Sequence, residues 1–165
     1  MSNGRAGAVS EITIRAIRPD DKERIVRAFQ ALDRRSVHLR FFSHKKTLSN
    51  EELRRVTECD GVSEAVLVAT VGSGDREVIV GVGSYVRSGA AADIAFAVEE
   101  DFQGRGIASR LLQQLVDIAR ANGIGRFEAD VLAENAPMLA VLRKSGLRMR
   151  TSCAQGVVHA ALFLM

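Results

Sequence analysis

Apolar and polar residues alternate first over residues 12–17, which is the period of a half-buried strand, and Pro19 ends that strand. Apolar residues then recur three and four positions apart, which predicts a helix, and Asp20 or Asp21 can cap its start. The apolar residues are Ile25, Phe29 and Leu32. The aromatic and basic segment 38–43 comes next, and its pattern fits either core filler or the rim of a substrate cleft.

A second helix and a hairpin are predicted next. Ser49 followed three residues later by Glu52 has the form of a capping box, which indicates a short helix behind it. Two apolar runs at 65–71 and 78–86 predict strands, and the glycine-containing segment 72–75 between them supplies the conformations that a tight turn needs. We therefore expect a β-hairpin.

The second half of the chain alternates strands with helices. A strand at 92–98 leads through a loop with two glycines into a long helix that ends near residue 122. One apolar stripe on this helix comprises Ile107, Ala108, Leu111, Leu112, Leu115, Val116 and Ala119. A strand at 127–132, a helix at 135–145 and a strand at 157–164 follow. With no repeat or linker, this order predicts one mixed α/β domain over residues 11–165 behind a disordered segment, residues 1–10.

Composition excludes several classes of protein. The 165 residues are 47% hydrophobic and 26% charged, which is typical of neither a disordered chain nor a membrane protein. The net charge of +3 is scattered and aromatics are few, so no nucleic-acid partner is predicted. Two cysteines are too few for a disulfide scaffold or zinc site, and we expect no metal. Without a signal-like or membrane-spanning run, a cytoplasmic location is expected.

The loop before the long helix has the chemistry of an anion site. Backbone N–H groups at a helix start lack intrahelical partners, the helix dipole is positive there, and Gly104 and Gly106 let the main chain approach a phosphate. Arg105 adds a positive charge. The same pattern also fits a plain turn before a helix, so the loop alone leaves both interpretations open.

The loop resembles the pyrophosphate loop of the GNAT acetyltransferase superfamily, with Gln103, Gly106 and Ala108 at the positions of its motif. The resemblance covers roughly residues 12–164. Residues 39–43 and 48–53 are similar to the bacterial Pat-type protein lysine acetyltransferases in particular. The superfamily resemblance implies a mostly antiparallel sheet, splayed at the acyl-CoA site, with helices on both faces.

The resemblance also implies acetyl-CoA as the co-substrate and identifies residues that bind it. The pyrophosphate would lie on the main chain of Gln103, Gly104, Arg105, Gly106, Ile107, Ala108 and Ser109. Ala97 and Val98 would contact the pantetheine along the edge of their strand. Asn135 would contact the cofactor from the last helix, and it fits a helix cap equally well.

Acetyl transfer to a lysine requires a base, because the lysine amine attacks only when deprotonated and, with a pKa near 10.4, it is almost fully protonated at pH 7. In Pat-type enzymes a glutamate on the strand before the loop has this role, and Asp93 stands at that position. Asp93 is therefore our candidate general base, against the alternative of a solvated carboxylate.

No general acid is indicated by the sequence. Leu142 stands where many members have a tyrosine acid, and the pattern around Tyr85 indicates a sheet residue. The three histidines, His38, His44 and His159, are expected at the surface or the cleft rim.

The resulting hypothesis is an N-acetyltransferase that moves acetyl from acetyl-CoA to an amine, with a protein lysine ε-amine favoured. The acceptor could be an acyl-CoA synthetase or another protein, and neither nucleic acid nor membrane is expected as a partner. A homodimer is compatible with the sequence. Two alternatives stay open: a small-molecule amine N-acetyltransferase, and a non-catalytic domain that senses acetyl-CoA.

Overall fold

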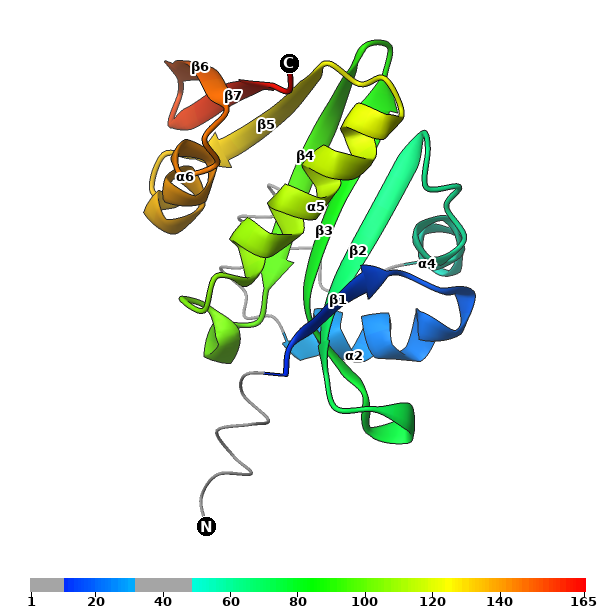
Figure 1. Ribbon diagram of the computed structural model, residues 1–165. Helices are drawn as coiled ribbons and strands as arrows, with labels where there is room; N and C mark the ends of the chain where they lie inside the picture. Colours follow the sequence, from blue (N-terminus) through cyan, green and yellow to red (C-terminus); the bar gives the residue numbers. More distant parts are fainter. Residues whose placement is uncertain (1–10, 32–48) are drawn as a thin grey trace.

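The computed structural model describes residues 11–31 and 49–165 and contains a seven-stranded sheet in the order β1-β2-β3-β4-β5-β7-β6 (Figure 1). Neighbouring strands are antiparallel except β4 and β5, which are parallel. The predicted mixed α/β fold with a mostly antiparallel sheet is thereby confirmed. The strands are β1 (Thr13–Ala16), β2 (Glu64–Val71), β3 (Val78–Ser88), β4 (Ala91–Val98), β5 (Arg126–Leu132), β6 (Arg148–Ala154) and β7 (Val157–Phe163).

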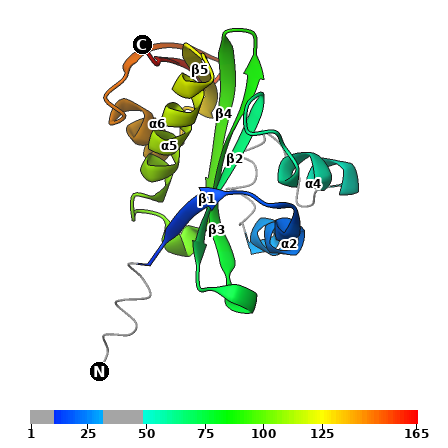
Figure 2. The ribbon, with the colours of Figure 1, turned by 45° about the vertical axis from the view of Figure 1, so that its right-hand side comes forward.

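Helices cover both faces of the sheet, as Figure 2 shows. Those in the described ranges are α2 (Lys22–Ala31), α4 (Asn50–Thr57), α5 (Ile107–Ala121) and α6 (Ala136–Arg143), with 3-10 turns η1 (Pro19–Asp21), η2 (Gly74–Arg76) and η3 (Glu100–Phe102). On one face α5 buries its predicted apolar stripe, with Leu111 and Leu115 fully inaccessible. On the other, α2 and α4 place Ile25 and Leu53 against β2 and β3.

Local sequence signals set the helix ends as predicted. The Ser49 hydroxyl accepts from the Glu52 N–H at 3.1 Å, and the Glu52 carboxylate accepts from the Ser49 N–H at 2.9 Å, which completes the capping box. The amide oxygen of Asn135 accepts from the Met138 N–H at 3.3 Å, so Asn135 is the N-cap of α6. The predicted hairpin is the antiparallel β2–β3 pair.

A glycine on β3, Gly83, allows the elements around the candidate site described below to pack closely. A Cβ atom on Gly83 would lie 2.9 Å from the ring of Phe96 on β4 and 3.1 Å from Cβ of Leu111 on α5. Real Cβ atoms do not approach other atoms at 2.9 Å, so this position requires glycine for space. The helix α5 and the Phe96 ring therefore pack directly on the backbone of β3.

An ionic cluster holds the turn between β1 and α2. Asp21 is fully buried, accepts from the Arg18 N–H at 2.8 Å, and is paired with Arg15 at 2.8 Å and Arg24 at 3.0 Å. Burial by itself raises the pKa of Asp21, but the hydrogen bonds from Arg15 and Arg18 outweigh it and lower the pKa to about 2. Asp21 therefore caps η1 as a carboxylate.

One strand was not predicted from the sequence. The strand β6 pairs with β7 at the sheet edge, and the two-residue turn between them has positive φ at Gln155 and Gly156, as a type I′ hairpin requires. Its side chains are mostly exposed, so it lacks the apolar alternation that marks a half-buried strand. The predictions for residues 1–10, Leu32 and 38–43 lie outside the described residues. Within the described ranges, no helix is long and apolar enough to cross a membrane.

Candidate functional site

The strands β4 and β5 part in the middle of the sheet. They pair in parallel at only three positions, of which Asp93 opposite Glu128 is the last. Beyond that pair, β4 continues to Val98 and β5 to Leu132 without pairing to each other. The splay expected of this sheet is therefore present, and it leaves one edge of β4 open.

Backbone groups of β4 alternate between its two edges, so only some residues face the gap. The Glu99 N–H donates to a β3 carbonyl at 2.8 Å, and by the period of two the backbone of Ala97 also faces β3. The backbone of Phe96 and Val98 faces the gap. In agreement, the side-chain amide of Gln103 donates to the Val98 carbonyl at 3.0 Å. Of the two residues predicted to meet pantetheine, Val98 can offer backbone and Ala97 only its methyl group.

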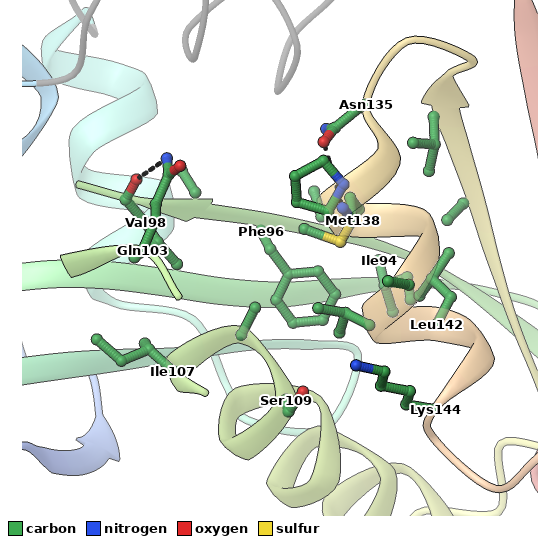
Figure 3. Close-up of a pocket in the computed structure, with 18 of the residues that line it drawn as sticks. Ile94, Phe96, Val98, Gln103, Ile107, Ser109, Asn135, Met138, Leu142 and Lys144 are labelled. Carbon is green, nitrogen blue, oxygen red and sulfur yellow. Dashed lines mark hydrogen bonds between the residues drawn. The ribbon is translucent and has the colours of Figure 1, made fainter. Parts of the chain in front are cut away.

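A cavity of about 660 Å³ occupies the gap, within the range of ordinary ligand sites. It is lined from β4, the glycine loop, α5, β5, α6 and β7 (Figure 3). The predicted site residues that line it are Asp93, Ala97, Val98, Gln103, Gly104, Gly106, Ile107, Ala108, Ser109 and Asn135. The structure thus brings together nearly all of the predicted residues, with Asn135 joining those of the stretch 93–109 from the start of α6.

The glycine loop presents free backbone donors to this cavity. Gly104 and Gly106 both have φ of +80°, which other residues rarely adopt, and α5 begins directly after Gly106. The first intrahelical bond runs from the Arg110 N–H to the Gly106 carbonyl, so the preceding N–H groups, those of residues 107–109, lack partners within the helix. Such N–H groups at the positive end of a helix dipole are suited to binding an anion.

Arg105 differs from the other loop residues because it does not line the cavity. Its guanidinium lies over the Phe102 ring, 5.1 Å from the ring centroid. Lys144, a cation directly after α6, lines the cavity instead. Figure 3 shows its side chain extending from the end of α6 toward the start of α5, where Ser109 lies.

One end of the cavity is apolar. It is formed by Ile94, Phe96, Ile107, Met138 and Leu142. Leu142, at the position where the resemblance implies a tyrosine acid in many members, is 1% exposed. Tyr85 is fully buried away from the cavity, and its hydroxyl is bonded to the Val62 carbonyl at 2.9 Å and to Asn122 at 3.1 Å. Tyr85 is therefore a core residue, as the sequence indicated.

The other end of the cavity is charged and lies on the opposite sheet face. Ala92 and Ile94 point into the α5 core, so Asp93 between them points away from it, as do Glu128 and Asp130 on β5. The cavity therefore extends through the gap between β4 and β5, from the α5–α6 face to this charged face. His159 on β7 completes the charged end.

Two of the three carboxylates at this end are engaged. Glu128 accepts from Arg126 at 2.8 Å through Oε2 and lies 3.2 Å from His159 Nε2 through Oε1. Asp130 Oδ1 lies 2.6 Å from His159 Nδ1. Asp93 is exposed, and among residues 11–31 and 49–165 its side chain forms no hydrogen bond or ion pair. The described residues contain no cluster suited to a metal ion.

Sequence reasoning did not find the partners of His159. Glu128 and Asp130 lie about thirty positions before it, a separation that carries no short-range pattern. The signal that could have indicated them is the alternation of β5, in which both carboxylates fall on the face opposite its buried residues.

Comparison with known proteins identifies the kind of site. The pattern of the Acetyltransferase (GNAT) family matches residues 32–147. The acetyltransferase Pat of Mycolicibacterium smegmatis is 31% identical over 136 residues, which are 81% of this chain and 40% of that protein. The chain therefore spans well under half the length of that relative.

Two solved structures share the fold. The GNAT domain of S. lividans PAT superposes with a TM-score of 0.82 at 34% identity, covering 91% of this chain and 89% of that one. The protein yncA of Salmonella typhimurium, solved with its cofactor acetyl-CoA, superposes with a TM-score of 0.74 at 20% identity, covering 93% of this chain and 94% of that one. Both resemblances noted in the sequence, to the superfamily and to the Pat type, are confirmed. The chain belongs to the GNAT family of acetyltransferases, which are acyltransferases that use acetyl-CoA as the acetyl donor.

Proposed function

We propose that this chain transfers the acetyl group of acetyl-CoA to the ε-amine of a protein lysine, with Asp93 as the general base. The observation that carries this assignment is that Asp93 is the one carboxylate of the cavity lining without a partner in the described ranges. A carboxylate whose oxygens already accept hydrogen bonds from Arg or His has fewer lone pairs left to meet an incoming amine than a carboxylate without such bonds. Glu128 and Asp130 are engaged in this way, and Asp93, among the described residues, is not.

The cofactor would enter from the face that carries α5 and α6. Its pyrophosphate would bind the free N–H groups at the start of α5, and Lys144 would add a positive charge. The pantetheine would lie in the gap and pair with the backbone of Phe96 and Val98, as a strand would. The apolar side chains that line the cavity on this face would exclude water from the thioester.

The amine would approach from the opposite face, where the cavity is charged. At pH 7 its deprotonation costs about 4.6 kcal/mol, because the lysine pKa is near 10.4. Asp93 would accept that proton, directly or through one water, while the amine nitrogen attacks the thioester carbon. The C–S bond then breaks, and the CoA thiolate takes its proton from solvent, since no acidic side chain stands at Leu142.

The choice of lysine is supported by the resemblance to Pat-type domains and by the charged mouth, which attracts an ammonium group. Two measurements test it. Calorimetry with acetyl-CoA tests the cofactor site, and thiol release with a panel of lysine peptides, an acyl-CoA synthetase and free polyamines tests the acceptor. If thiol were released only with free amines, the acceptor would be a small-molecule amine and not a protein lysine. Tight acetyl-CoA binding without release from any acceptor would indicate a sensor domain.

A further inference from the structure

His159 is held between two carboxylates at the charged end of the cavity. Its Nδ1 lies 2.6 Å from Asp130 Oδ1 and its Nε2 lies 3.2 Å from Glu128 Oε1. A neutral imidazole has one donor and one acceptor nitrogen, whereas carboxylate oxygens only accept. Contacts from both ring nitrogens to carboxylates are therefore satisfied together only by the imidazolium. Consistently, the hydrogen bond to Asp130, together with the charge of Glu128, raises the pKa of His159 above its usual value.

Protonation of His159 neutralises this group of side chains. Arg126 and the imidazolium carry two positive charges, which match the two negative charges of Glu128 and Asp130. The next strand contributes no charge to them directly, because Ser152 is the residue of β6 opposite His159. The nearest cations of β6, Arg148 and Arg150, lie over the Phe163 ring at 5.0 and 5.7 Å.

When His159 loses its proton, the same group acquires a net negative charge beside Asp93. Glu128 is the register partner of Asp93, and neighbouring strands lie about 4.8 Å apart, so this charge is close to the proposed base. His159 itself lines the cavity, with 46% of its side chain exposed. An ammonium group entering here is attracted more strongly by the deprotonated state than by the protonated one.

We propose that His159 is a specificity-determining residue of the acceptor site, whose protonation state sets how strongly the charged end of the cavity attracts a cationic amine. The inference rests on the proposed function, because it takes the amine to approach at Asp93. By linkage, a bound cationic amine must lower the proton affinity of His159 by the same factor by which deprotonation tightens amine binding.

The test measures binding without turnover. A capped peptide with a single lysine is titrated by calorimetry into the protein saturated with desulfo-CoA, which carries no thiol, from pH 5.5 to 8.5. The lysine stays cationic over this range because its pKa is near 10.4. For the wild type we expect the Kd to fall roughly five-fold across the titration of His159, the low end of coupling between neighbouring sites.

Two substitutions at His159 should give Kd values at the two limits of the wild-type range. His159→Gln removes the titrating charge, so its Kd should stay low at all pH values, near the wild-type value at pH 8.5. His159→Lys fixes the positive charge, so its Kd should stay high. Ser152→Ala is the matched control, because Ser152 is exposed opposite His159 but outside the cavity, and it should follow the wild type.

The readouts separate this inference from the proposed function. NMR of the His159 ring, with and without the peptide, gives its titration independently of catalysis, and the peptide should shift that titration to lower pH. Absence of acetyl transfer together with pH-dependent peptide binding would refute the proposed reaction and keep the cation site. A flat wild-type Kd while His159 titrates, pH dependence that persists in His159→Gln, or no peptide binding at any pH would overturn the inference.

Discussion

Asp93 and Glu128 occupy the same rung of the β4–β5 ladder, the last one before the two strands part. Both side chains point to the charged face of the sheet, yet their surroundings differ. Glu128 is held by Arg126 and His159, whereas Asp93 has no partner in the part of the chain that the structure describes. Of these two adjacent carboxylates, one is therefore engaged by basic side chains, whereas the other, within the described residues, is not.

Removal of the proposed base should abolish most of the activity. We expect Asp93→Asn to lower kcat by roughly 10²- to 10⁴-fold, because general-base catalysis contributes about that much, and to leave acetyl-CoA affinity unchanged. Asp93→Glu keeps the carboxylate and should retain most of the rate. Asp117→Asn, on the exposed side of α5, is the control. An unchanged rate for Asp93→Asn across pH 6 to 9 would remove Asp93 from the mechanism.

The glycine loop can be tested with a pair of equivalent substitutions. Gly106 and Gly89 both have positive φ, at +80° and +65°, and an added Cβ would meet no atom within 4 Å at either. Alanine at each position should therefore lower the free energy of unfolding by about 1–2 kcal/mol. Only Gly106→Ala should also weaken acetyl-CoA binding, measured by calorimetry, since Gly89 lies outside the cavity lining. Equal affinities in the two variants would argue against the loop as the phosphate site.

The ionic cluster around Asp21 should make folding sensitive to acid. Its pKa is lowered from 3.8 to about 2 in the folded protein, so its stabilisation is fully present above pH 4 and is lost as the pH falls toward 2. The stabilisation amounts to about 2 kcal/mol. Urea unfolding at pH 7 and near pH 2 should therefore show a large deficit for Asp21→Asn at the first pH and a much smaller one at the second.

The control for this prediction is Asp75→Asn, since Asp75 is exposed in η2. It should change the free energy of unfolding little at either pH. A deficit for Asp21→Asn that persists undiminished near pH 2 would show that packing, and not charge, is what the substitution removes.

Tyr85 should matter for stability and not for catalysis. Tyr85→Phe removes the hydrogen bonds to the Val62 carbonyl and Asn122, which should cost about 1 kcal/mol in the free energy of unfolding. The values of kcat and KM should stay within about two-fold of wild type, which is the scatter of the assay, because a hydrogen bond in the core stabilises the fold and takes no part in the reaction. A folded variant with a greatly reduced kcat would instead place the Tyr85 hydroxyl in the reaction.

Much of this protein could be predicted from short stretches of sequence. The capping box at Ser49, the stripe of α5 and the glycines before it are local signals, because a few consecutive residues determine a cap, a helix face or a positive φ. The family motif adds the order of the parts and the position of Asp93. These signals indicated the proposed cofactor loop and the candidate base.

The tertiary structure decided what no local pattern contains. Strand pairing joins residues that are distant in the chain, so it alone placed His159 between Asp130 and Glu128 and left Asp93 without a partner among residues 11–31 and 49–165. It also revealed β6, whose exposed side chains carry no apolar period because the strand lies at the sheet edge. Local conformation depends on neighbours in sequence, whereas the charge and proton affinity of a site depend on neighbours in space, which only the register of the folded sheet determines.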